Sequence, residues 1–78
     1  MRNYYDLLQV QRDAKDVVIR ASYEALLQTY HPDKLEDRRR GHRIAKLLAE
    51  AYTTLNDPTI RAEYDRELEM VERGVFAW

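Results

Sequence analysis

The fold is decided by residues 16–34, whose sequence is DVVIRASYEALLQTYHPDK. Four large apolar or aromatic residues recur in this stretch at i, i+4, i+7 and i+11, namely Ile19, Tyr23, Leu26 and Tyr30. This spacing is typical of one face of an α-helix, so we expect a helix from about Asp16 to Tyr30. Pro32 should end it, because proline lacks the amide donor and disfavours the helical conformation of the residue before it.

A second apolar stripe follows the charged connection formed by residues 34–41. Its members are Ala45, Leu48, Tyr52 and Leu55, with Ile44 and Leu47 beside them. The pattern predicts a helix from about His42 to Leu55. Because the connection is short, the two helices should form an antiparallel hairpin with their stripes facing each other. The loop at the hairpin tip then lies in water, which exposes His31, Pro32 and Asp33.

Capping signals predict two further helices. Asn3 is a suitable N-cap for a short helix from about Tyr4 to Gln9, and Asp57-Pro58 is a helix-start signature. The helix that begins at Pro58 can continue to Glu72 and should end at Gly74. We therefore expect an all-α fold, an antiparallel hairpin of two long helices with two short flanking helices. Residues 1–67 are assigned to this domain, and residues 68–78 to a C-terminal helical extension with an apolar tail.

Composition excludes several classes of function. The chain has 78 residues, enough for one small domain with a thin core. It has no cysteine and only two histidines without metal-ligand spacing, so we expect no metal and no other cofactor. Ser22 lies within an expected helix, which argues against a nucleophile triad. No apolar run is long enough to span a membrane, and the charged N-terminus favours a cytoplasmic location.

The charges are unevenly distributed along the chain. The formal net charge is −1, but residues 34–46 carry six basic and two acidic side chains. Residues 57–73 carry three basic and six acidic side chains. The sequence therefore predicts a molecule with a basic middle and an acidic C-terminal helix.

Several short motifs occur in an order that resembles the J domain of the DnaJ family. The first is Tyr4-Tyr5-Asp6-Leu7-Leu8, and the second is Tyr30-His31-Pro32-Asp33-Lys34. The others are Glu50-Ala51-Tyr52, Asp57-Pro58, Arg61-Ala62 and Tyr64-Asp65. His-Pro-Asp alone is a weak tripeptide signal, but the resemblance extends from about Asn3 to Arg66.

This resemblance implies a co-chaperone rather than an enzyme. J domains dock on the nucleotide-binding domain of a DnaK-type heat-shock chaperone, near its interdomain linker, and stimulate its ATP hydrolysis. By resemblance, Asp33 pairs with an arginine of the partner, His31 holds the loop and contacts the partner, and Pro32 fixes the backbone. Lys34, Arg20 and Tyr23 would complete the binding surface. We expect a monomer that binds neither nucleic acid nor membrane.

The chain departs from the usual J-domain pattern on the second helix. Ala21, Glu24, Ala25 and Thr29 stand where lysine or arginine is common, and only Arg20 remains of the basic face. Glu24 should also pair with Arg20, because the two residues are four apart on a helix. Elsewhere Ala45 replaces a large aromatic residue, Gln9 replaces a frequent glycine, and Lys15 stands where serine or threonine often caps.

Some alternatives remain open at this point. Tyr23 can be a core residue or present its hydroxyl edge to the partner. The arginines at positions 38–40 are expected in a solvated loop, although they could steer an acidic partner surface. A helix-turn-helix nucleic-acid module is disfavoured, because the basic residues fall in this loop and the chain is slightly acidic. A J-like docking scaffold without ATPase stimulation is the main rival, since the basic face is depleted.

Overall fold

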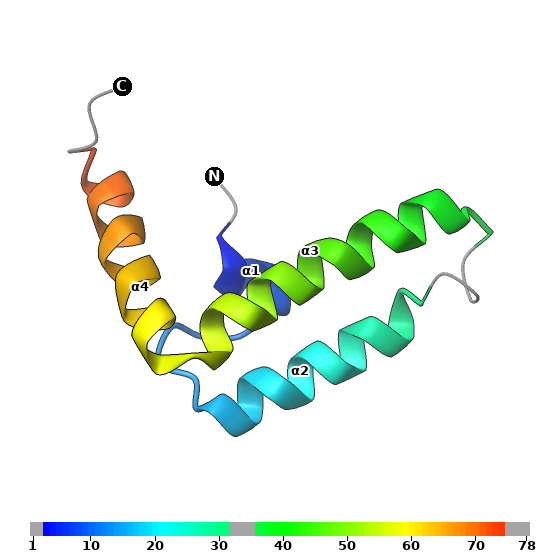
Figure 1. Ribbon diagram of the computed structural model, residues 1–78, viewed down its shortest axis with the longest axis horizontal. Helices are drawn as coiled ribbons and strands as arrows, with labels where there is room; N and C mark the ends of the chain where they lie inside the picture. The colour runs from blue at the N-terminus through cyan, green and yellow to red at the C-terminus, as the bar shows by residue number, and fades with distance from the viewer. Residues whose placement is uncertain (1–2, 32–35, 75–78) are drawn as a thin grey trace.

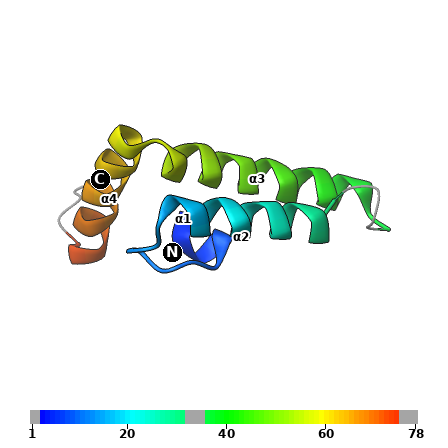
Figure 2. The same cartoon turned by 90° about the horizontal axis from the view of Figure 1, so that it is seen from below.

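The computed structural model describes residues 3–31 and 36–74 and is all-helical over these ranges. Its elements are α1 (Tyr4–Leu8), α2 (Asp16–Thr29), α3 (Arg38–Asn56) and α4 (Pro58–Arg73). Helices α2 and α3 run antiparallel, side by side, and α1 packs against both of them (Figures 1 and 2). The molecule measures 41 × 30 × 17 Å, so the hairpin sets its long axis. This is the fold that the apolar stripes predicted.

The helix termini show why the elements begin and end where they do. The Asn3 side chain accepts a hydrogen bond from the Asp6 amide at 2.9 Å, and Asp57 accepts from the amides of Thr59 and Ile60 at 2.9 and 3.2 Å. Gly74 ends α4 in the left-handed conformation, with φ of 72°. These three caps confirm the boundaries expected from the sequence. Lys15, at the N-cap of α2, makes no side-chain cap bond.

Helix α3 begins earlier than expected. It starts at Arg38 rather than His42, because the Asp37 carboxylate caps it by accepting a hydrogen bond from the Arg40 amide at 3.2 Å. Gly41 lies inside the helix and is buried, so it is a packing position rather than the end of a loop. The expectation that the arginines at 38–40 lie in a solvated loop is therefore wrong. They form the first turn of α3.

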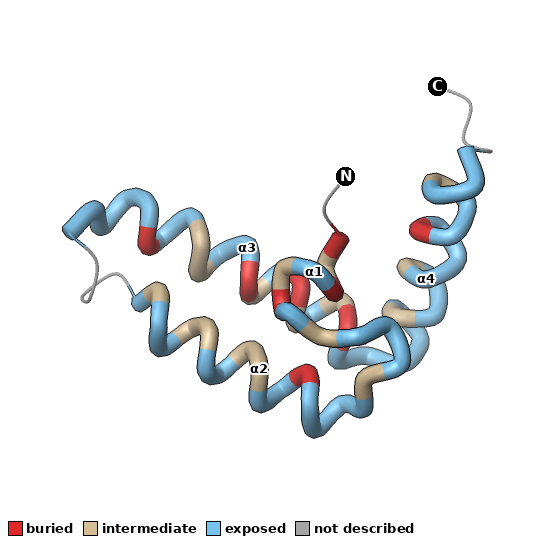
Figure 3. The backbone as a smooth tube through the Cα atoms, turned by 180° about the vertical axis from the view of Figure 1, so that it is seen from behind, coloured by how far each residue is buried: buried red, intermediate tan, exposed pale blue. Residues whose placement is uncertain are grey.

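A single apolar core joins the four helices. Its buried members, marked red in Figure 3, are Tyr5, Leu8, Ile19, Leu48, Ala51, Leu55 and Leu68. Ile44 is half-buried against this cluster and Leu48 lies within it. Ile44 and Leu48, the neighbours of Ala45 on α3, thus both contribute to the core.

Helix α4 ends at Arg73, one residue beyond the end expected from the sequence. It spans 16 residues against 14 for α2, and it leaves the end of α3 at a steep angle (Figure 1). It crosses the expected boundary between residues 67 and 68 without a break, and Leu68 is 8% exposed within the common core. Among the described residues, no helix has both the length and the apolar character needed to cross a membrane.

Candidate partner-binding site

The predicted signature loop leaves the hairpin at the C-terminal end of α2. Tyr30 caps that helix, and its amide donates to the Leu26 carbonyl at 3.0 Å. His31 follows and is exposed. Pro32, Asp33 and Lys34 lie outside the described residues, so their expected roles stay predictions. The end of α2 and the first turn of α3 lie at the same end of the hairpin (Figures 1 and 2), which we call the hairpin tip.

Arg20 lies on the exposed side of α2. Its Nε atom donates to the Glu24 carboxylate at 3.2 Å, with 69% and 58% of the two side chains exposed. The pairing expected from the four-residue spacing is thus present. An exposed ion pair of this kind contributes little to stability, but it neutralises the one cation of the helix.

Tyr23 connects the two long helices. Its ring stacks on the ring of Tyr52, with centroids 4.4 Å apart and planes inclined by 7°. The side chain is half-buried and packs against the core cluster. The structure therefore gives Tyr23 a packing role, and its expected contact with a partner stays a prediction.

The outer surface of α2 is apolar and slightly acidic. Its charged residues are Asp16, Arg20 and Glu24, which leaves a charge of −1. Val17 and Val18 are 69% and 49% exposed, and all four positions at which the chain departs from the J-domain pattern are exposed as well. The missing basic side chains would therefore have faced solvent. Their absence alters the binding surface rather than the core.

Positive charge is concentrated instead on the first half of α3. Residues 38–46 contain no acidic side chain. The basic residues of this segment are all exposed, and they are Arg38, Arg39, Arg40, Arg43 and Lys46. A shallow hollow beside them, of about 450 Å³, is lined by residues that include Leu7, Tyr30, Arg40 and Leu47.

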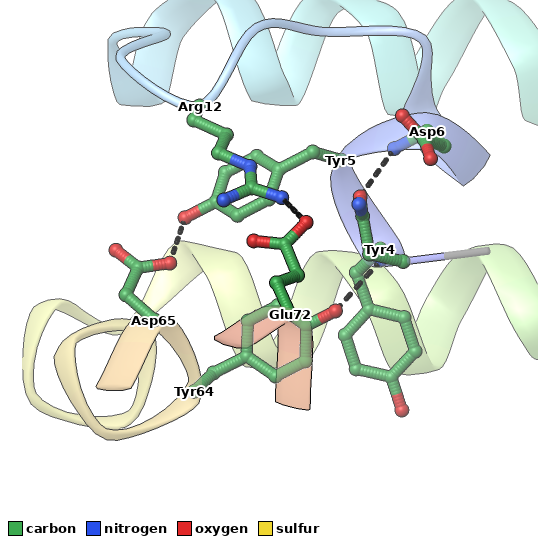
Figure 4. A network of polar contacts seen from close by, with 8 residues as sticks. Tyr4, Tyr5, Asp6, Arg12, Tyr64, Asp65 and Glu72 are labelled. Carbon is green, nitrogen blue, oxygen red and sulfur yellow. Dashed lines mark hydrogen bonds and ion pairs between the residues drawn. The ribbon is translucent and has the colours of Figure 1, made fainter. Parts of the chain in front are cut away.

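Far from the hairpin tip, polar contacts tie α4 to α1 and to the α1–α2 connection. Arg61 donates from Nε to the Tyr5 hydroxyl at 3.1 Å and from one terminal nitrogen to the carbonyls of Arg12 and Ala14 at 2.8 and 2.9 Å. Its guanidinium carbon lies 5.5 Å from the centroid of the Tyr5 ring. The Tyr5 hydroxyl in turn donates to Asp65 (Figure 4). Burial, supported by the bond to Asp65, raises the pKa of Tyr5 and keeps its hydroxyl a donor.

Two further contacts strengthen the same end of the molecule, which we call the base. The Tyr4 amide donates to the Tyr64 hydroxyl at 2.9 Å, and the two rings stack with centroids 4.8 Å apart (Figure 4). Burial raises the pKa of Tyr64. Arg12 pairs with Glu72, and its hydrogen bond lowers the pKa of that carboxyl. The sequence analysis did not identify the partners of the Tyr5 and Tyr64 hydroxyls.

A signal for this network was present in the sequence. A buried tyrosine hydroxyl needs a polar partner, and Arg61 and Asp65 lie one helical turn apart on α4. No group of three or more histidine, aspartate or glutamate side chains that could hold a metal occurs in the part of the chain that the structure describes.

Comparisons with known proteins agree with the motif order. Residues 3–65 match the family model of the DnaJ domain. The chain belongs to the DnaJ domain family. It is 42% identical over 64 residues to the chaperone protein DnaJ of Brucella anthropi, and 44% identical over 64 residues to those of Brucella canis and Brucella suis. These alignments cover 82% of this chain but only 17% of each relative, so the similarity concerns the J domain alone.

Because the chain belongs to the DnaJ domain family, the hairpin tip is the region to consider for partner binding. In this J domain the tip carries His31 and the first turn of α3, while the aromatic and polar contacts lie at the base. His31 and the unusual α2 surface therefore both lie in the solvent-facing part of the described domain. The fold that supports them is the expected one.

Proposed function

We propose that this J domain binds a DnaK-type heat-shock chaperone at its nucleotide-binding domain and linker region, and stimulates its ATP hydrolysis through His31, Pro32 and Asp33. The observation that carries the proposal is the position of His31, exposed directly after the C-cap of α2 in a chain that belongs to the DnaJ domain family. Loops displayed on a rigid helical frame are common sites of protein recognition. The domain itself performs no chemistry and acts as a cytoplasmic monomer.

The proposed roles follow the chemistry of the side chains. Asp33 forms a charge-assisted hydrogen bond with an arginine of the partner, a contact that is costly to truncate once desolvated. His31 and Pro32 position the loop, and Lys34 adds positive charge beside it. Arg20 and Tyr23 extend the contact along α2, where they lie within one turn of each other.

Single-turnover ATP hydrolysis by a bacterial DnaK, measured with and without this domain, tests the proposal. We expect His31→Gln and Asp33→Asn to abolish stimulation while the thermal midpoint changes little, because exposed substitutions usually alter stability by less than about 0.5 kcal/mol. His42→Gln and Asp13→Asn are matched controls, since both residues are exposed and lie outside the loop. Stimulation by either loop variant at the parent level would contradict the mechanism.

A docking scaffold without ATPase stimulation is the second candidate. The observation that favours it is the Arg20–Glu24 pair, which leaves α2 without an unpaired cation among its described side chains. The scaffold would bind the chaperone in a titration yet leave the hydrolysis rate unchanged. The two functions are thus separated by measuring binding and single-turnover hydrolysis on the same preparations.

A further inference from the structure

The first half of α3 carries an unusual accumulation of positive charge. Three of its basic residues, Arg39, Arg43 and Lys46, are spaced i, i+4 and i+7 and therefore share one face of the helix. We call these three residues the α3 basic stripe. All three are exposed, and none forms an ion pair with any other residue in the ranges 3–31 and 36–74. Glu50, one turn beyond Lys46, is the first acidic residue after Asp37.

This accumulation does not serve the stability of the helix. Positive side chains near a helix N-terminus oppose the helix dipole, and like charges four residues apart repel each other. Asp37 offsets part of this through its cap bond to the Arg40 amide, but no residue of the stripe forms an ion pair with another described residue, Glu50 included. Side chains that cost the free protein stability and face solvent are typical of a binding surface.

The location of the stripe matches the need for positive charge near the loop. Helix α3 begins at Arg38, at the same end of the hairpin as His31 (Figures 1 and 2). The neighbouring helix α2 has a charge of −1, and its one arginine is paired with Glu24. The stripe begins at the hairpin tip with Arg39 and continues along α3, and its cations form no ion pair with other described residues, whereas the one arginine of α2 is paired.

We propose that the α3 basic stripe is an electrostatic docking surface for a carboxylate-rich face of the DnaK-type partner. This inference rests on the proposed function and names the element that steers the partner in this chain. A cluster of exposed like charges raises the association rate with an oppositely charged surface, and the effect weakens as salt screens it. A protein partner is favoured over nucleic acid because the stripe has only three cations and the chain is slightly acidic overall.

The test compares Arg39→Gln/Arg43→Gln with Lys15→Gln/Arg66→Gln, which removes the same charge from exposed positions outside the stripe. The readout is the domain concentration that gives half-maximal single-turnover stimulation of a bacterial DnaK. It is measured at low and tenfold higher salt, a change that shortens the screening length about threefold. For the stripe variant we expect this concentration to rise about five- to tenfold at low salt and less than about twofold at high salt. The control should stay within about twofold of the parent at both salts.

Further measurements separate electrostatics from folding. The thermal midpoint of the stripe variant should equal or exceed that of the parent, and Arg39→Lys/Arg43→Lys, which keeps the charge, should stimulate like the parent. Equal half-maximal concentrations for the stripe variant and the control would overturn the inference, while a loss of stimulation by His31→Gln would still support the proposed function. A parent domain that neither binds nor stimulates DnaK would overturn both. Binding of a labelled DNA duplex that depends on Arg39 and Arg43, with stimulation unchanged, would also overturn the inference.

Discussion

At the base of the molecule polar side chains bond to one another, whereas at the hairpin tip they face solvent. The base contains Arg61 with three acceptors, and the stacked rings of Tyr4 and Tyr64. At the tip every described residue from Glu36 to Arg40 is exposed. The two regions belong to one domain, but the polar side chains of the base bond to other protein groups, whereas those of the tip are exposed to water.

This difference separates stability from recognition. Hydrogen bonds and buried rings at the base hold α1 and α4 against the hairpin, and their loss leaves polar groups without partners. Exposed charges at the tip contribute little to the free energy of folding and stay available for a partner. Substitutions at the base should therefore change the thermal midpoint, and substitutions at the tip should change stimulation of the chaperone.

The largest effect on stability is expected for Leu48→Ala in the shared core. Leu48 is 4% exposed and packs where α1, α2 and α3 meet, so its truncation should cost about 2–5 kcal/mol of unfolding free energy. In a domain this small that cost approaches the whole stability, and thermal or urea unfolding measures it. Leu47→Ala is the control, because Leu47 is 46% exposed and should change stability by less than about 1 kcal/mol. Equal losses for the two variants would contradict the assignment of the core.

A smaller loss is expected when the base is weakened at Arg61. Arg61→Met keeps much of the side-chain volume but removes the donors to Tyr5 and to two backbone carbonyls. We expect the unfolding free energy to fall by about 2–3 kcal/mol, because the substitution removes hydrogen bonds from a charged donor and leaves their partly buried acceptors without partners. Arg66→Met, on the exposed side of α4, should change the unfolding free energy by less than about 0.5 kcal/mol.

Measuring how well the Arg61→Met domain stimulates the chaperone tests whether the base and the hairpin tip act independently. Well below its melting temperature, the Arg61→Met domain should stimulate DnaK at the parent level, because the described hydrogen bonds of Arg61 join it to Tyr5, Arg12 and Ala14, which lie away from the hairpin tip. A loss of stimulation in the folded variant would show that the base also controls the docking surface, and the comparison of the two ends would fail.

Local patterns predicted most of the fold. The apolar stripes through Ile19 and Leu48 predicted the hairpin. The N-caps Asn3 and Asp57 were predicted as well, because a capping residue is recognised from the few residues that follow it in the sequence. The start of α3 was predicted too late, because the sequence alone does not distinguish a glycine in a loop from a glycine buried inside a helix, as Gly41 is. Only packing against neighbouring helices makes Gly41 a helix residue.

The contacts of the site that could be predicted are those between residues close together in the sequence. The Arg20–Glu24 pair follows from four-residue spacing on one helix. The bonds of Tyr5 to Asp65 and of Tyr4 to Tyr64 join residues 60 apart, and no periodicity reports such contacts. The stack of Tyr23 on Tyr52 likewise depends on the register of two helices, which sequence patterns leave open.

A still smaller effect is expected on α2, where Glu24→Lys should strengthen docking. The change removes a negative charge and releases Arg20 from its pair, so we expect a gain on the order of 1 kcal/mol in binding free energy at low salt. A titration of DnaK at two salt concentrations measures it, and the gain should shrink as salt rises. Glu63→Lys on α4 makes the same charge change away from the tip and is the control. Equal affinities of the Glu24→Lys domain and the parent at low salt would show that α2 lies outside the docking surface.

The smallest expected effect concerns the residue in left-handed conformation that ends α1. Gln9 ends α1 with φ of 57°, a conformation that costs an L-residue about 1 kcal/mol and glycine very little. Gln9 is exposed, so Gln9→Gly should relieve this strain without opening a cavity. Part of the gain is lost because glycine also frees the unfolded chain, which leaves a net stabilisation of about 0.5 kcal/mol. Gln11→Gly, at an exposed position without positive φ, should destabilise instead, and urea unfolding compares the two variants. Stimulation of DnaK should be unchanged in both. Destabilisation by Gln9→Gly would mean that the Gln9 side chain stabilises the folded domain by more than its backbone strain costs.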